Sequence, residues 1–168
     1  MPYLTQESGI SPKSAVGVIS VFTASGAFAT LGIGTVSDRL PPRLLMVGSY
    51  LVAAVAMGLL IIADSLPEVY LFAVLQGIAA IGINLTSPML LAQYYGRWAM
   101  GSMYGIVRAA QVVGFAIGAL VSGVVYDSTG SYQLAFSIFL FIALVSALFI
   151  LATKRPTQNQ SRGLHAEA

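Results

Sequence analysis

Five long stretches of apolar, almost uncharged sequence constrain this chain more than any other feature. They cover about residues 15–36, 44–63, 69–92, 102–126 and 134–153. Each is close to the roughly 20 residues that an α-helix needs to cross a hydrocarbon core. Lipid offers no partner to an unpaired backbone N–H or C=O group, and the strict alternation of barrel strands is missing. We therefore predict an all-α, polytopic membrane helix bundle with five transmembrane helices.

The composition excludes several classes of function. Hydrophobic residues make up 57% of the 168 residues and charged residues only 8%, against about 25% charged residues in soluble domains. Cysteine is absent and His165 is the only histidine, so a metal site or a catalytic triad has almost nothing to be built from. The few basic residues are too sparse for a nucleic-acid surface. We expect no enzyme activity, no cofactor, no metal and no nucleic-acid partner.

The segments between the apolar stretches carry most of the charge and predict the orientation. Six basic residues fall on one side of the membrane and only Lys13 on the other; the six are Arg39, Arg43, Arg97, Lys154, Arg155 and Arg162. The positive-inside rule then places the N-terminus outside and the C-terminus in the cytoplasm. We expect an integral protein of the plasma (inner) membrane, with a bundle over residues 14–153 and a disordered cytoplasmic tail over residues 154–168.

A short motif occurs twice, three helices apart and with opposite topology. Gly34 precedes Asp38 by four residues, and Gly123 precedes Asp127 by four. Such a pair suggests a three-plus-three inverted repeat, as found in transporters, although glycine and aspartate are also ordinary near helix ends. In a true repeat, one triplet lacks its first helix. Residues 1–13 are then the extracellular end of a missing helix.

The motifs resemble those of the major facilitator superfamily. Gly34-Thr-Val-Ser-Asp38-Arg39-Leu-Pro-Pro-Arg43 is similar to the cytoplasmic signature loop of that family, except for its two prolines. Gly123, Asp127 and Gly130 are similar to the motif at the end of its penultimate helix. The opening Pro2-Tyr3-Leu4 and the pair Tyr104-Gly105 resemble the monocarboxylate and oxalate–formate branch. The five helices then correspond to helices 8–12 of twelve.

This resemblance implies secondary active transport by alternating access, in which two halves rock about a central site. The partners are then the lipid bilayer, a small organic solute, which we expect to be a carboxylate, and a missing N-terminal transporter half. Two alternatives stay open. The chain could be a membrane scaffold or assembly subunit that transports nothing, or an inert truncated transporter.

Arg108 is the foremost candidate for binding the solute. It lies on one continuous helix face, given by the helical spacing, with Tyr104, Gln111, Phe115, Gly118 and Ser122. Arg108 could anchor a carboxylate through its guanidinium fork, contact an acid of the missing half, or extend its head group to the membrane interface. The oxalate–formate resemblance implies a basic residue nearer Gln111, so its absence here disfavours an oxalate-like substrate.

Further candidates lie on two other helices. Gln76 and Asn84 precede Pro88 in the third stretch, where a proline frees a backbone carbonyl and kinks the helix. Each is a candidate substrate contact or an interhelical hydrogen bond. Thr30 is a further candidate for binding the solute. It also belongs to a row of small residues in the first stretch, Ser20, Thr23, Ala27, Thr30 and Gly34, which we interpret as a close-packing face.

The loop charges have two interpretations each. Asp38, Arg39 and Arg43 either only fix the topology or, as the family signature, help to latch the inward-closed state. Asp127 either caps or turns the chain at the outer surface or couples a proton.

Overall fold

The computed structural model describes residues 12–63, 65–95 and 100–153. These residues form five helices and no strand: α2 (Pro12–Ser37), α3 (Pro42–Ile61), α4 (Leu66–Tyr95), α5 (Met100–Thr129) and α6 (Gln133–Ala152). The all-α prediction is confirmed, and each helix begins and ends within three residues of its predicted bounds. The predicted tail, residues 154–168, and most of the predicted extracellular segment, residues 1–11, lie outside the described residues.

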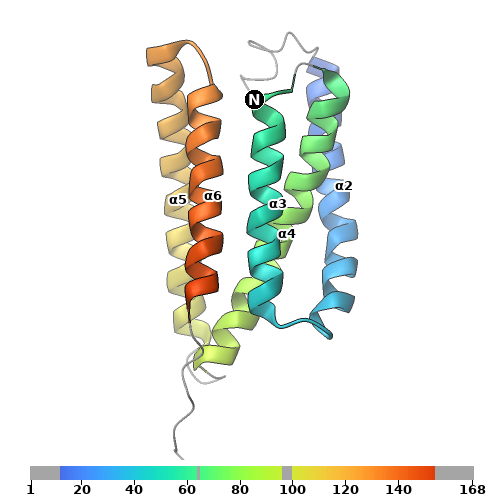
Figure 1. Cartoon of the computed structure of the whole chain (residues 1–168), viewed down its shortest axis with the longest axis vertical. Helices are drawn as coiled ribbons and strands as arrows, with labels where there is room; N and C mark the ends of the chain where they lie inside the picture. Colours follow the sequence, from blue (N-terminus) through green and yellow to red (C-terminus); the bar gives the residue numbers. More distant parts are fainter. Residues whose placement is uncertain (1–11, 64, 96–99, 154–168) are drawn as a thin grey trace, which may run out of the picture.

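All five helices of the described part are long and apolar enough to cross a membrane. Consecutive helices run in opposite directions (Figure 1). The end of the bundle where α2 ends and α3 begins is called the Arg43 end. The opposite end, where α5 ends and α6 begins, is called the Gly130 end.

Proline and glycine mark two of the helix boundaries. Pro42 occupies the first turn of α3. A backbone N–H at this position has no acceptor within the helix, so proline loses no hydrogen bond there, and its fixed φ suits a helix. Gly130 follows α5 with φ +69°, and its N–H donates to the Tyr126 carbonyl oxygen at 2.8 Å. This left-handed conformation is the usual way to end a helix at glycine.

Four helices form a packed layer in the order α2, α4, α3, α6. Two glycines of α4 bring its neighbours close. A Cβ atom at Gly77 would overlap the Ser25 hydroxyl and the Phe22 carbonyl oxygen of α2, and one at Gly82 would overlap Ser49 of α3. Without a hydrophobic drive between helices in lipid, such close backbone approach is a main source of association.

The α3–α6 contact also uses small side chains. Ala135, Ala143 and Ala147 of α6 are buried, and a Cβ atom placed on Gly58 of α3 would lie 3.5 Å from the Leu140 side chain of α6. The rest of the α6 surface is largely apolar and exposed, which suits contact with lipid.

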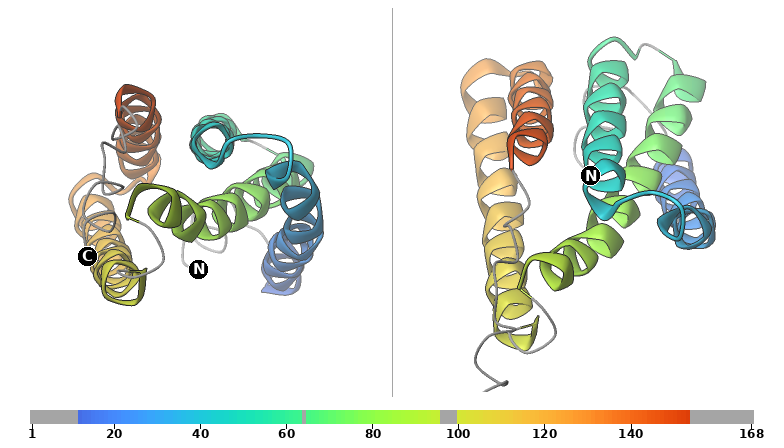
Figure 2. Two further views of the ribbon diagram at one scale, coloured as in Figure 1. Left: turned by 90° about the horizontal axis from the view of Figure 1, so that it is seen from below. Right: turned by 60° about the horizontal axis from the view of Figure 1, so that its bottom comes forward.

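Helix α5 is packed far more loosely. It makes few contacts with α4 and α6, and none of its membrane-spanning window is buried. Viewed from the end of the bundle, α4 crosses from α2 toward the beginning of α5 (Figure 2). Helix α5 therefore stands at the edge of the molecule.

The packing face predicted for the first helix is wrong for the contacts within the described chain. Its five small residues are all exposed on α2. The side of α2 that meets α4 instead carries Val18, Ser25 and Gly26, and Val18 is only 3% exposed. The row of small residues did not predict the contact between α2 and α4, because that contact is made at Gly26, one position before Ala27.

Candidate functional site

Arg108 is the one charged residue of the described helices that lies more than two residues from a helix end. It is the ninth residue of α5, so its Cα lies about 12 Å along the axis from Met100. An arginine at such a depth costs about 2.5–3.5 kcal/mol in a lipid-exposed helix. Its side chain therefore needs polar partners.

Two amide side chains supply these partners. Nη1 of Arg108 donates to Oδ1 of Asn84 at 2.7 Å and to Oε1 of Gln111 at 3.0 Å. These three residues are called the Arg108 cluster. Gln111 lies about one turn farther from the Arg43 end than Arg108, so the guanidinium is directed into the bundle. The three alternatives for Arg108, a carboxylate anchor, a contact to an acid of the missing half and extension to the interface, stay predictions.

The sequence of α4 orients Asn84 for this contact. Nδ2 of Asn84 donates to the Ala80 carbonyl oxygen at 2.8 Å, which turns Oδ1 toward Arg108. Pro88 lies inside α4 and has no N–H to donate to the carbonyl of Asn84, four residues earlier. The cluster therefore combines an oriented side-chain oxygen with a backbone carbonyl that lacks its usual helical donor.

The cluster is suited to holding an anion. A guanidinium has five N–H donors, and both side-chain contacts of Arg108 use only Nη1. Arg108 is exposed, and within residues 12–63, 65–95 and 100–153 no carboxylate pairs with it. Its Nε and Nη2 donors can therefore meet the two oxygens of a carboxylate side by side.

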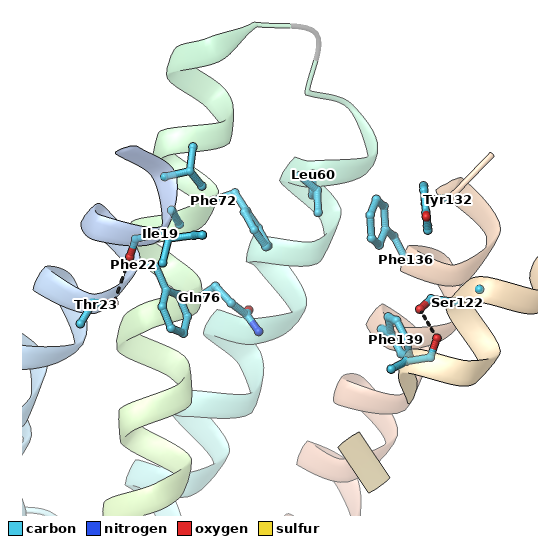
Figure 3. Close-up of a pocket in the computed structure, with 14 residues that line it drawn as sticks. Ile19, Phe22, Thr23, Leu60, Phe72, Gln76, Ser122, Tyr132, Phe136 and Phe139 are labelled. Carbon is cyan, nitrogen blue, oxygen red and sulfur yellow. Dashed lines mark hydrogen bonds between the residues drawn. The ribbon is translucent and has the colours of Figure 1, made fainter. Parts of the chain in front are cut away.

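Gln76 lies apart from this cluster, in a cavity of about 690 Å³ near the Gly130 end. All five helices contribute to its lining, which we call the aromatic chamber. It consists of Val18, Ile19, Phe22, Thr23, Leu60, Phe72, Ala73, Gln76, Ala119, Ser122, Gly123, Tyr132, Phe136 and Phe139. In Figure 3, Gln76 extends from α4 toward the side where Ser122 and Phe139 lie.

The side-chain oxygen of Gln76 has unusual surroundings. It is buried and has no hydrogen-bond partner among the described residues. An unsatisfied buried acceptor costs about 1–3 kcal/mol. This orphaned oxygen makes Gln76 a stronger candidate for a ligand contact than its sequence position alone indicates.

Thr30, the remaining candidate for solute binding, is not part of either feature. It is exposed on α2, and its hydroxyl donates to the Gly26 carbonyl oxygen at 3.0 Å. A role in binding stays a prediction for this residue.

The signature loop separates into two parts. Gly34, Asp38 and Arg39 are exposed where α2 ends, and no atom outside the helix itself lies within 4 Å of a Cβ placed on Gly34. Arg43 instead turns to the end of α6. Its Nε donates to the Ile150 carbonyl oxygen at 3.0 Å and its Nη2 to the carbonyl oxygen of Leu151. The last carbonyls of a helix carry partial negative charge, so a cation there is stabilising.

The motif at the Gly130 end serves the turn between α5 and α6. Gly123 and Asp127 are exposed, and Gly130 supplies the left-handed residue. The hydroxyl of Thr129 donates to the Val125 carbonyl oxygen at 2.7 Å, while the N–H of Gln133 donates to the Ser131 hydroxyl at 3.2 Å. The turn is therefore held by neighbours of Asp127, whose own role stays a prediction.

Sequence reasoning missed the aromatic walls of the chamber and the capping role of Arg43. Phe136 and Phe139 lie on α6, whose few polar side chains gave no reason to expect a binding site there. Their three-residue spacing places them on one side of the helix, and this was the available signal. The partners of Arg43 are more than 100 residues away in the chain, and no local pattern indicates them.

The fold and the cluster together define a class: a polytopic α-helical membrane protein with a polar, cationic site between two of its helices. The sequence matches the Major Facilitator Superfamily over residues 1–167. The chain belongs to this family, and the resemblance of its motifs is confirmed.

Several curated proteins are similar to the chain. The 4-hydroxybenzoate transporter PcaK of Acinetobacter baylyi is 29% identical over 89% of the chain and 33% of its own length. The inner membrane transport protein YnfM of Escherichia coli is 26% identical over 88% of the chain and 35% of its own length. Monocarboxylate transporter 13 of Rattus norvegicus is 26% identical over 88% of the chain and 33% of its own length.

The chain thus spans about a third of the length of the curated relatives it matches. No solved structure matches it significantly.

Proposed function

We propose that this chain is part of a secondary active transporter that moves a small organic carboxylate across a membrane by alternating access. The observation that carries the proposal is the Arg108 cluster. A cation inside a membrane helix, with two amide partners and donors to spare, is typical of a substrate or ion pathway. In this proposal Arg108 binds the carboxylate, and Asn84 and Gln111 hold the guanidinium in place.

The names of relatives support a solute with a single carboxylate. PcaK of Acinetobacter baylyi and PcaK of Pseudomonas aeruginosa are 4-hydroxybenzoate transporters, and the rat relative is a monocarboxylate transporter. One arginine is matched in charge to one carboxylate. We therefore take aromatic monocarboxylates as the first substrates to test.

The transporting unit in this proposal includes helices beyond the five described ones. The relatives are about three times as long as the stretch they share with this chain, which supports an N-terminal half that completes the cavity. The orientation proposed from the basic residues puts the Arg43 end in the cytoplasm, in the plasma membrane of the host. The mass of the protein purified from host membranes tests whether an N-terminal half is present. A product of 17.6 kDa would favour the scaffold or inert-fragment alternatives.

Uptake of labelled solute tests the function. The transporter as its host makes it is reconstituted in vesicles and given 4-hydroxybenzoate, benzoate and lactate, with uncharged 4-hydroxybenzamide as comparison. Arg108→Ala should lower uptake of the transported acid at least about 30-fold, since removing one partner of a desolvated charge pair costs about 2–5 kcal/mol.

The matched control is Val112→Ala, an exposed apolar residue of the same helix, which should leave uptake unchanged. Undiminished uptake by Arg108→Ala would rule out Arg108 as the anchor. Failure of the unaltered protein to take up any of the acids would rule out the carboxylate as substrate.

A further inference from the structure

The aromatic chamber and the Arg108 cluster are two separate places in the molecule. Gln76 and Asn84 are eight residues apart on α4, which corresponds to about 12 Å along the helix axis, and their directions around the helix differ by roughly 80°. The two side chains therefore leave α4 at different depths and in different directions. Any role of the chamber is therefore additional to the binding of a carboxylate by Arg108.

The chamber is of ligand-binding size and has aromatic walls. Its volume of about 690 Å³ falls within the range of about 300–1,000 Å³ typical of small-molecule sites. Phe72, Phe136 and Phe139 contribute rings from two different helices (Figure 3). Such walls favour a flat ring, which can stack on them or meet them edge to face.

Three polar side chains of the chamber, Gln76, Thr23 and Ser122, present acceptor oxygens. The Gln76 side-chain oxygen is buried without a partner in the described residues. The hydroxyls of Thr23 and Ser122 donate to the carbonyl oxygens of Ile19, at 3.0 Å, and Ala119, at 2.9 Å, so their protons are committed to their own helices and their lone pairs remain. None of the lining residues is charged. A lining without charge and with one unpartnered buried acceptor suits an uncharged group that brings a donor.

We propose that the aromatic chamber is a second binding site, which takes an uncharged aromatic ring bearing one hydrogen-bond donor, such as a phenolic hydroxyl, with Gln76 as the acceptor. As a stage on a transport route, the chamber lies toward the Gly130 end of the bundle from the Arg108 cluster, a placement that rests on the proposed transport function. The binding itself does not depend on transport.

The test measures binding of phenol, and of anisole, in which a methyl ether replaces the hydroxyl. The full transporter is purified in lipid nanodiscs, and ligand binding is followed by saturation-transfer NMR with empty nanodiscs as blank. Gln76→Leu should weaken phenol binding about five- to tenfold, as expected for one neutral hydrogen bond, and leave anisole binding unchanged. Gln93→Leu, an exposed glutamine on the same helix, is the matched control and should change neither.

A second variant fills the space without removing a polar group. Gly123 lines the chamber, and a Cβ atom there meets nothing within 4 Å, so Gly123→Leu should fold and lower the binding of both phenol and anisole. Gly114→Leu, on the same helix, is also open at its Cβ but lies outside the chamber, and should have no effect.

The outcomes separate this proposal from the proposed transport function. Phenol binding should persist in Arg108→Ala, whereas binding and uptake of benzoate should be lost. The chamber would be overturned as a binding site if the unaltered protein showed no saturable phenol binding. The same would follow if Gln76→Leu and Gly123→Leu both bound phenol as tightly as the unaltered protein. The role of Arg108 in uptake would be unaffected by that result.

Discussion

The packed layer of α2, α4, α3 and α6 and the loosely attached α5 use the same residue types for opposite purposes. In the layer, Gly77 and Gly82 allow neighbouring helices to touch. On α5, Gly114 and Gly123 face open space, and Phe115 and Leu120 are 75% and 69% exposed. The helix that carries Arg108 is thus the one least fixed by packing. The chain therefore carries its one charge deep inside a helix on the element that the described layer holds least tightly.

The largest expected effect is on the layer itself. Gly77→Leu should destabilise the protein by about 3 kcal/mol or more, because the new side chain meets a backbone oxygen that cannot rotate away. Melting in detergent should show a Tm lower by roughly 6–12 °C. Gly114→Leu on α5 is the control and should melt like the unaltered protein. Equal Tm values for the two variants would contradict the contrast between the layer and α5.

The next effect concerns the fastening of α6 to the layer. Arg43→Ala removes both hydrogen bonds to the α6 carbonyls and should cost about 2 kcal/mol, a Tm loss of roughly 4–8 °C. Arg39→Ala removes the same charge from the same loop without touching α6, so it controls for topology and should change the Tm little. A Tm loss as large in Arg39→Ala would show that only the charge matters.

A smaller effect should appear in binding and not in stability. Asn84→Leu keeps the volume of the side chain but removes the oxygen that holds Arg108. The KM for the transported carboxylate should rise about tenfold, with the Tm almost unchanged, since one hydrogen bond to a charged group is worth about 1.5–3 kcal/mol. A lower Tm with an unchanged KM would instead make Asn84 a packing residue of α4.

The smallest effect is at the turn between α5 and α6. Gly130→Ala places a side chain on a residue with φ +69°, which should cost about 1 kcal/mol and lower the Tm by roughly 2–4 °C. Gly101→Ala, in the first turn of α5 with open space around it, should not lower the Tm. If Gly130→Ala is also neutral, the connection between α5 and α6 is as loose as their packing.

The positions of the helices and part of the candidate site could be predicted from the sequence. Which helices pack against one another could not. Apolar length predicts a membrane helix directly, so all five were found. Arg108 and Asn84 stood out because polar groups are costly in lipid, and the structure brings them together. The contact of α6 with α3 was not predictable, because apolar helices in lipid carry no strong pattern that selects a partner. The chamber could not be predicted for the same reason. Phe136 and Phe139 resemble lipid-facing residues in the sequence, and only the position of α5 makes them part of a cavity wall.

The hydrogen bonds of Arg43 also bear on how the protein is made. They join an arginine at the start of α3 to carbonyls 107 and 108 residues later in the chain. While the intervening helices are being synthesised, these bonds cannot exist. They form only once α6 has entered the bilayer and reached its full length. Helix α3 thus enters the bilayer before its partner α6 exists, and this side of the layer cannot close until α6 is in place.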